Sequence, residues 1–134
     1  MNYSEAEPIY PSFLTGNDLI QLFAKAKKAY TNQTDKLVTA FHVSSFISNP
    51  IGTYSSGMVK KLSLILSLIG HPKVILLDEP LVTIDNLSIP VIIDLINEYY
   101  EQKGVTFLLT SHQVFEKMKF NSFYELNMRN QTVI

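Results

Sequence analysis

The chain has 134 residues, a length that suits one domain, with 11 Lys and Arg against 12 Asp and Glu. This balance argues against a dedicated nucleic-acid binder, which usually carries a basic patch. The absence of cysteine excludes disulfides, thiolate metal ligands and a cysteine nucleophile. Charged residues make up only 17% of the chain, below the roughly 25% of an average soluble domain. The composition therefore predicts exposed apolar surface that a partner covers.

No apolar run approaches the roughly 20 residues that a membrane-spanning helix needs. The two longest runs are Leu62–Ile69 and Ile89–Ile96, and the second contains Pro90 and Asp94. The N-terminus also lacks the basic-then-apolar pattern of a signal peptide.

The first third of the chain predicts two helices after an irregular lead-in over residues 1–14. Thr15 is a candidate N-cap with Asp18 as its capping-box partner, for a helix from Gly16 to about residue 30. A second short helix is expected near Asp35–His42. Turn residues then indicate a loop over residues 43–53.

The middle of the chain predicts a buried helix followed by a βαβ unit. Ser55 or Ser56 caps an apolar helix from Gly57 to about Ile69, and Gly70 ends it. The elements expected after it are a strand at Lys73–Leu77, a helix from Pro90 to about Gln102, a strand at Val105–Thr110, a helix after His112, and short strands near Phe123–Asn127 and Thr132–Ile134. A strand, a long helix and a second strand in this order imply a right-handed βαβ unit, in which the two strands are parallel.

The strongest chemical motif is the run VILLDEP at Val74–Pro80. Ligands of open α/β sheets bind beyond the carboxyl ends of the strands. In a functional interpretation, Asp78 holds Mg²⁺, through water, and Glu79 polarises the attacking water in phosphoryl transfer. In the alternative, the two acids merely end a strand in a solvated loop, and the heptapeptide alone does not decide between them.

Two weaker motifs flank this run. Tyr54-Ser55-Ser56-Gly57-Met58 puts hydroxyls and backbone N–H groups at a helix start, which can bind an anion, although Ser-Ser before a helix is also ordinary capping. Thr110-Ser111-His112 follows the second strand. A histidine there could donate to a phosphate oxygen, or could simply lie on the surface.

The order of these motifs resembles the ABC ATPase family. YSSGM is similar to its signature motif, VILLDEP to Walker B with the catalytic glutamate, Leu81–Asp85 to the D-loop, and Ser111-His112 to the switch loop. The resemblance covers nearly the whole chain. It implies an α/β, P-loop NTPase (RecA-like) parallel sheet with a helical signature subdomain at about residues 10–70 and a catalytic part at about 71–134.

The resemblance also implies site roles and partners. Asp78 would serve Mg²⁺, Glu79 the hydrolytic water and His112 the γ-phosphate. Ser55, Ser56 and Gly57 would contact ATP held by the opposite subunit of a homo- or heterodimer, and Asp85 would communicate across that dimer. The remaining implications are a transmembrane permease subunit as partner and a cytoplasmic location peripheral to the cell membrane.

One family element is missing from the sequence: no G-x-x-x-x-G-K-[ST] motif occurs, so the phosphate cradle and its lysine are absent. Ala6 also stands where an ungapped comparison puts the Q-loop glutamine. We therefore expect a partial domain that alone binds ATP poorly. Two rivals are a non-catalytic remnant that pairs with a complete ATPase, and the DNA-repair branch of the superfamily, which the balanced charge disfavours.

Overall fold

The computed structural model describes residues 1–110, 126–127 and 132–133. Its main sheet contains three parallel strands in the order β1-β2-β3: β1 (Asn2–Ser4), β2 (Val74–Asp78) and β3 (Thr106–Thr110). A separate antiparallel pair joins β4 (Leu126–Asn127) to β5 (Thr132–Val133), where two short strands were predicted. The α/β class with a parallel sheet is thereby confirmed.

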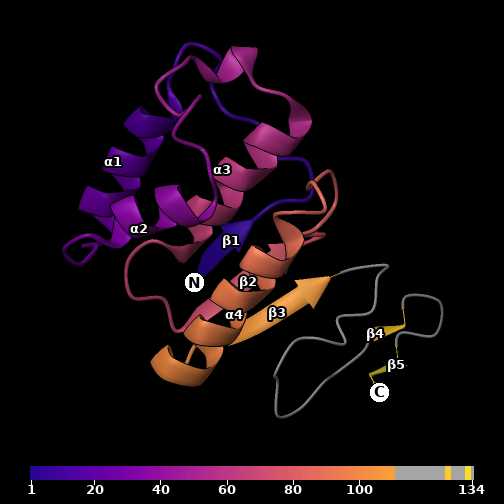
Figure 1. The fold of residues 1–134 in the computed structure, drawn as a ribbon. Coiled ribbons are helices and arrows are strands. Elements are labelled where there is room, and N and C mark those ends of the chain that lie inside the picture. Colours follow the sequence, from indigo (N-terminus) through magenta and orange to yellow (C-terminus); the bar gives the residue numbers. More distant parts are fainter. Residues whose placement is uncertain (111–125, 128–131, 134) are drawn as a thin grey trace.

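In the part of the chain that the structure describes, four α-helices and one 3₁₀ turn accompany the sheet. Figure 1 shows α1, α2 and α3 grouped at one end of the molecule and α4 near the strands. Their bounds are α1 Gly16–Ala26, α2 Gln33–Ala40, a 3₁₀ turn at Ile51–Thr53, α3 Ser56–Leu68 and α4 Ile89–Lys103. Within the described residues no helix is long and apolar enough to cross a membrane.

The prediction of an irregular lead-in was wrong at its start, because residues 2–4 form β1. The strand carries no apolar alternation. Its inward-facing side chains are Asn2 and Ser4, both buried. The Asn2 amide donates to the carbonyls of Ser67 and Ile69, at 2.8 and 3.0 Å, and the Ser4 hydroxyl lies 2.7 Å from that of Ser63. Polar contacts with α3 thus stabilise β1, and for this reason its sequence lacks the apolar pattern that usually indicates a strand.

The helix starts were better predicted than the helix ends. The Thr15 hydroxyl accepts from the Asp18 N–H at 3.0 Å while the Asp18 carboxylate accepts from the Thr15 N–H at 3.0 Å, so the capping box forms. However, α1 ends at Ala26 instead of near residue 30, because Lys28 adopts a left-handed conformation with φ 55°. A positive φ interrupts a right-handed helix whatever its apolar periodicity.

The sheet has two different faces. Ile75 and Leu77 on the face that packs against α3 are buried, and they belong to the main core. On the other face the register aligns Tyr3 with Leu76 and Leu76 with Leu108. Tyr3 and Leu108 are 48% and 50% exposed, although parallel sheets are normally covered on both faces.

Candidate functional site at the carboxyl end of the sheet

The two acidic candidates lie at the carboxyl end of β2, beside the end of β3. Asp78 and Thr110 are register partners, and the Thr110 hydroxyl donates to the Asp78 carboxylate. The Glu79 N–H donates to the Thr110 carbonyl at 2.9 Å and lies 3.2 Å from the Thr110 hydroxyl. Both acids are half-buried. The strand ends therefore bring the Asp78 carboxylate, the Thr110 hydroxyl and the backbone of Glu79 together, as expected for the functional edge of a parallel sheet.

Glu79 has an unusual backbone conformation, with φ 48°. The left-handed region costs a residue with a side chain roughly 1–2 kcal/mol. The contacts of its N–H with Thr110 hold this conformation in place. It turns the chain sharply immediately after β2, and strained backbone of this kind clusters at functional sites.

The donors at this edge suit a hard cation such as Mg²⁺. Magnesium in proteins is usually held by one or two carboxylates together with substrate phosphates and water. Asp78 supplies such a carboxylate next to the Thr110 hydroxyl. Across the described ranges no group of three or more His, Cys, Asp or Glu side chains gathers to hold a metal. The Asp78 carboxylate and the Thr110 hydroxyl therefore fit a cation that takes only one or two of its ligands from the protein.

The serine candidates lie at the start of α3, where capping is part of their role. Ser55 is the N-cap, and its hydroxyl accepts from the Met58 N–H at 3.2 Å. Ser56 is the first helical residue, and both serines are exposed. The hydroxyl of Ser55 keeps its own proton for donation. Exposed hydroxyls and free N–H groups at a helix N-terminus form a surface suited to an anion.

Gly57 brings this helix start against the loop that follows β2. A Cβ atom at position 57 would lie 2.7 Å from the carbonyl oxygen of Thr83. Thr83 itself has φ 67°. Only glycine fits at this distance, so the YSSGM motif and the 81–85 segment, separate in the sequence, are in direct contact.

Asp85 joins the same loop to both neighbouring helices. It accepts from the Ser88 N–H at 3.1 Å and from the Ser88 hydroxyl, just before α4. It also pairs with the Lys61 ammonium of α3 at 2.9 Å. Lys61 and then Ser88 lower the pKa of Asp85 below its ordinary value. Within the described residues Asp85 thus has contacts inside its own chain, in addition to any that a second subunit would offer.

Sequence reasoning missed Lys60, which is 1% exposed within α3. Its ammonium donates to the carbonyls of Asp78 at 2.9 Å, Glu5 at 2.6 Å and Ala6 at 3.4 Å. Burial lowers the pKa of Lys60, and the nearby Asp78 and Glu79 carboxylates oppose that shift. The available signal was a lysine that begins an apolar helical run. Lys60 links the segment after β1 to the end of β2.

The structure does not describe the histidine candidate. Ser111 and His112, and the helix predicted after them, lie outside the described residues. The structure therefore brings together Asp78, Glu79 and Thr110 at one strand edge, and Gly57 with the 81–85 loop beside them.

The family assignment comes from comparison with known sequences. The ABC transporter family model matches residues 4–82. An uncharacterised ABC transporter ATP-binding protein of Bacillus subtilis (strain 168) is 32% identical over 105 residues, which are 78% of this chain and 34% of that protein. The cytochrome c biogenesis ATP-binding export protein CcmA of Legionella pneumophila (strain Lens) is 41% identical over 78 residues, which are 58% of this chain and 38% of that protein.

Solved structures agree on the fold. The ATP-binding subunit of an ABC transporter superimposes with a TM-score of 0.72 at 24% identity, over 83% of this chain and 48% of the other. A dimeric bacterial ABC transporter cassette gives 0.72 at 15% identity, over 84% of this chain and 52% of the other. The chain thus spans about half of these structures and about a third of the two bacterial relatives. On the family-model match, this chain belongs to the ATP-binding domain family of ABC transporters.

Proposed function

We propose that this chain carries the hydrolytic half of an ATPase domain that energises transport through a separate membrane protein. The observation that carries the proposal is the convergence of Asp78, Glu79 and Thr110 at one edge of a parallel sheet. A carboxylate pair at such an edge can hold a divalent cation and orient water, which is most of what phosphoryl transfer requires of a protein.

Each acid then has its own role. Asp78 holds Mg²⁺, through water, while the Thr110 hydroxyl fixes the carboxylate by donating to it. When bound, the ion neutralises charge on the transferred phosphate. Glu79, in the sharp turn that follows β2, accepts a hydrogen bond from the attacking water and so orients it. His112 contacts the γ-phosphate.

The start of α3 acts on a second nucleotide. The γ-phosphate of ATP bound by an opposite subunit contacts Ser55, Ser56 and Gly57. Asp85 communicates the binding of that ATP across the dimer. The contact of Gly57 with Thr83 and the Lys61–Asp85 pair support this division, because they tie the helix start to the loop. A dimeric cassette among the similar structures supports the pairing of two domains.

The permease contact belongs to the helical part of the chain. Ile9 and Phe13 are 89% and 79% exposed in the segment before α1. Two large apolar side chains so close together are unusual on a free surface and typical of a contact region. Docking there places the domain on the cytoplasmic side of the membrane.

A complementation experiment tests the proposal. The phosphate-binding N-terminal half of an ABC ATP-binding domain is fused ahead of Met1, and ATP binding and hydrolysis are compared with the chain alone. We expect negligible turnover and no micromolar Mg-ATP affinity from the chain alone, since losing one preorganised donor already costs roughly 10²–10³ in rate. The fusion should show both ATPase turnover and micromolar affinity for Mg-ATP. A well-folded fusion that binds ATP without hydrolysing it would favour a non-catalytic module.

A further inference from the structure

A cavity lies at the opposite end of the sheet from the acidic site. It measures about 450 Å³ and is lined by residues from the α1–α2 connection, the α3–β2 connection and the end of α4. Lys73 immediately precedes β2, whereas Asp78 ends it. At about 3.3 Å per residue, the two sites lie at least about 13 Å apart. The volume falls within the roughly 300–1,000 Å³ usual for small-molecule sites.

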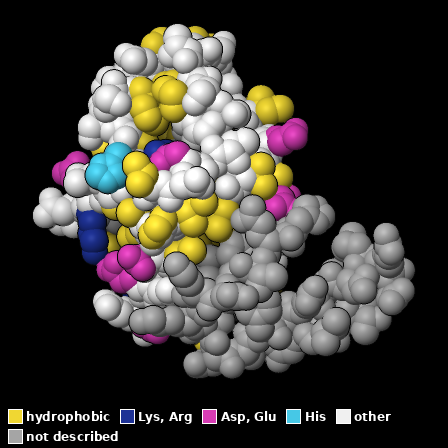
Figure 2. Space-filling view, turned by 45° about the vertical axis from the view of Figure 1, so that its right-hand side comes forward, with side chains coloured by type: hydrophobic (Ala, Val, Ile, Leu, Met, Phe, Trp, Pro, Cys, Tyr) yellow, Lys and Arg dark blue, Asp and Glu magenta, His cyan; other side chains and the backbone are white. Residues whose placement is uncertain are grey.

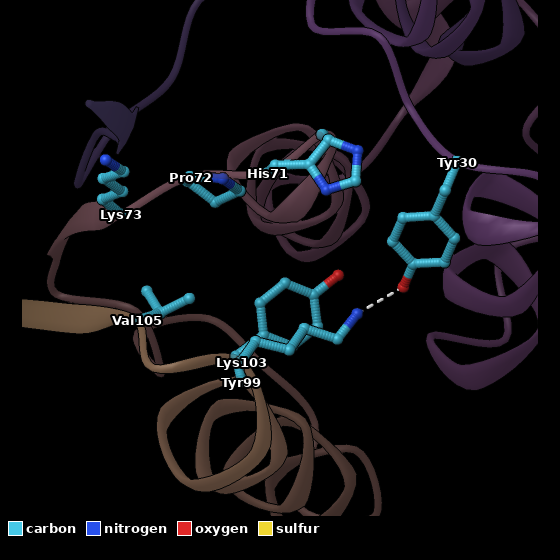
Figure 3. A pocket seen from close by; sticks show the side chains of 8 residues that line it. Tyr30, His71, Pro72, Lys73, Tyr99, Lys103 and Val105 are labelled. Atoms are coloured by element: carbon cyan, nitrogen blue, oxygen red, sulfur yellow. Dashed lines mark hydrogen bonds between the residues drawn. The ribbon is translucent and has the colours of Figure 1, made fainter.

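The cavity combines flat aromatic walls with positive charge. The Lys103 ammonium hydrogen-bonds to the Tyr30 hydroxyl and lies 4.4 Å from the ring centroids of both Tyr30 and Tyr99 (Figure 3). The His71 ring lies 5.7 Å from that of Tyr30, and Lys73 is also among the lining residues, although its ammonium points away from the other side chains (Figure 3). No acidic side chain occurs among the described residues that line the cavity.

The aromatic wall is held by a buried hydrogen-bond network. The Tyr99 hydroxyl donates to the Leu68 carbonyl at 2.9 Å, and the Gln33 amide donates to the carbonyls of Leu68 and Gly70 at 2.9 and 3.1 Å. Burial raises the pKa of Tyr99, so its hydroxyl stays a neutral donor. The carbonyls that end α3 would repel an anion if they were free. Gln33 and Tyr99 occupy these carbonyls, and Lys103 supplies a positive charge beside the aromatic wall.

From this arrangement we propose that the cavity binds a small organic anion with a flat apolar body, such as an aromatic carboxylate. The carboxylate accepts from Lys103, whose ammonium carries three N–H donors and can keep its hydrogen bond with Tyr30 while it forms an ion pair with the ligand. The ring lies against Tyr99, Pro72 and Val105. The site uses none of the residues of the acidic edge, so it stands independently of the proposed ATPase role.

Calorimetric titration of the full 134-residue chain at about 0.15 M salt tests the site. The probes are benzoate, its neutral isostere benzamide, and inorganic phosphate. We expect benzoate to bind with a Kd below about 1 mM, within the reach of a ligand of that size. Benzamide and phosphate should each bind at least about tenfold more weakly than benzoate. Benzamide lacks the negative charge, and phosphate lacks the aromatic ring.

Two matched variants locate the binding. Lys103→Met keeps the apolar stem and removes the charge, and should weaken benzoate at least about tenfold. Lys25→Met removes the same charge from an exposed position on α1, outside the cavity, and should change nothing. Circular dichroism verifies that both fold. The proposal is wrong if benzoate does not bind, if benzamide or phosphate binds equally well, or if the two variants behave alike.

Discussion

At the scale of single residues, Gly57 is the position where the least chemical change should have the largest effect. A Cβ there would approach the Thr83 carbonyl to 2.7 Å, and the backbone oxygen cannot turn aside as a flexible side chain would. Gly57→Ala should therefore destabilise the chain by about 1–3 kcal/mol, as overpacking usually does. Urea unfolding followed by circular dichroism measures this cost. Ser56→Ala, one residue earlier and exposed, serves as control, and equal losses in both variants would contradict the contact.

Asp85 predicts a pH dependence of stability. Its folded-state pKa is lowered by Lys61 and Ser88 from the ordinary 3.8. A lowered acid pKa contributes stability that is fully present above the unfolded pKa and is lost as pH falls through the folded pKa. Because the Asp85 side chain is 54% exposed, Asp85→Asn should cost at most about 1 kcal/mol at pH 7. Thermal unfolding of both proteins should differ above the ordinary pKa of 3.8 and converge once the pH has fallen below the lowered pKa of the folded state. If the difference in thermal stability between the two proteins stayed unchanged at acidic pH, the charge of the Asp85 carboxylate would not be its cause.

At the scale of elements, the helices and strands with a local residue pattern could be predicted from the sequence. A strand held in place by residues distant in the sequence could not. The capping box of Thr15 and Asp18 and the apolar run of β2 are local signals, and both elements form. Strand β1 carries no such signal, because its buried Asn2 and Ser4 are satisfied by α3 more than 55 residues away. The motif predicted that Asp78 and Glu79 lie where a strand ends, and β2 does end at Asp78. The roles assigned to Asp78, Glu79, Ser55 and Asp85 all stay predictions.

Lys60 makes contacts between elements that could not be predicted from the sequence. Its buried ammonium donates hydrogen bonds to three backbone carbonyls, which belong to two segments. Lys60→Met keeps the apolar volume but leaves those acceptors without their donor, which costs about 1–3 kcal/mol. Hydrogen exchange should also rise for the segment after β1. Lys61→Met, which breaks only the partly exposed pair with Asp85, should cost less. A larger effect from Lys61 would refute this ranking.

At the scale of the whole molecule, the half-exposed apolar row across the sheet predicts self-association. Tyr3, Leu76 and Leu108 lie in register on one face, and in the described residues β3 pairs only with β2. An uncharged edge strand without proline invites pairing. Leu108→Lys should raise the dissociation constant of any dimer at least about tenfold, whereas Leu22→Lys on α1, at 60% exposure, should not. Light scattering over a wide concentration range decides this. A strict monomer with unprotected amides at 105–110 would contradict it.

The central claim concerns Glu79 and is tested in the fusion that restores the phosphate-binding half. Glu79→Gln keeps the size and removes the carboxylate that orients water. Steady-state ATPase turnover should fall at least about a hundredfold, the usual worth of a general base, while Mg-ATP affinity stays unchanged. Glu101→Gln, exposed on α4, should retain full turnover. Near-normal turnover in the Glu79 variant would contradict the proposed site.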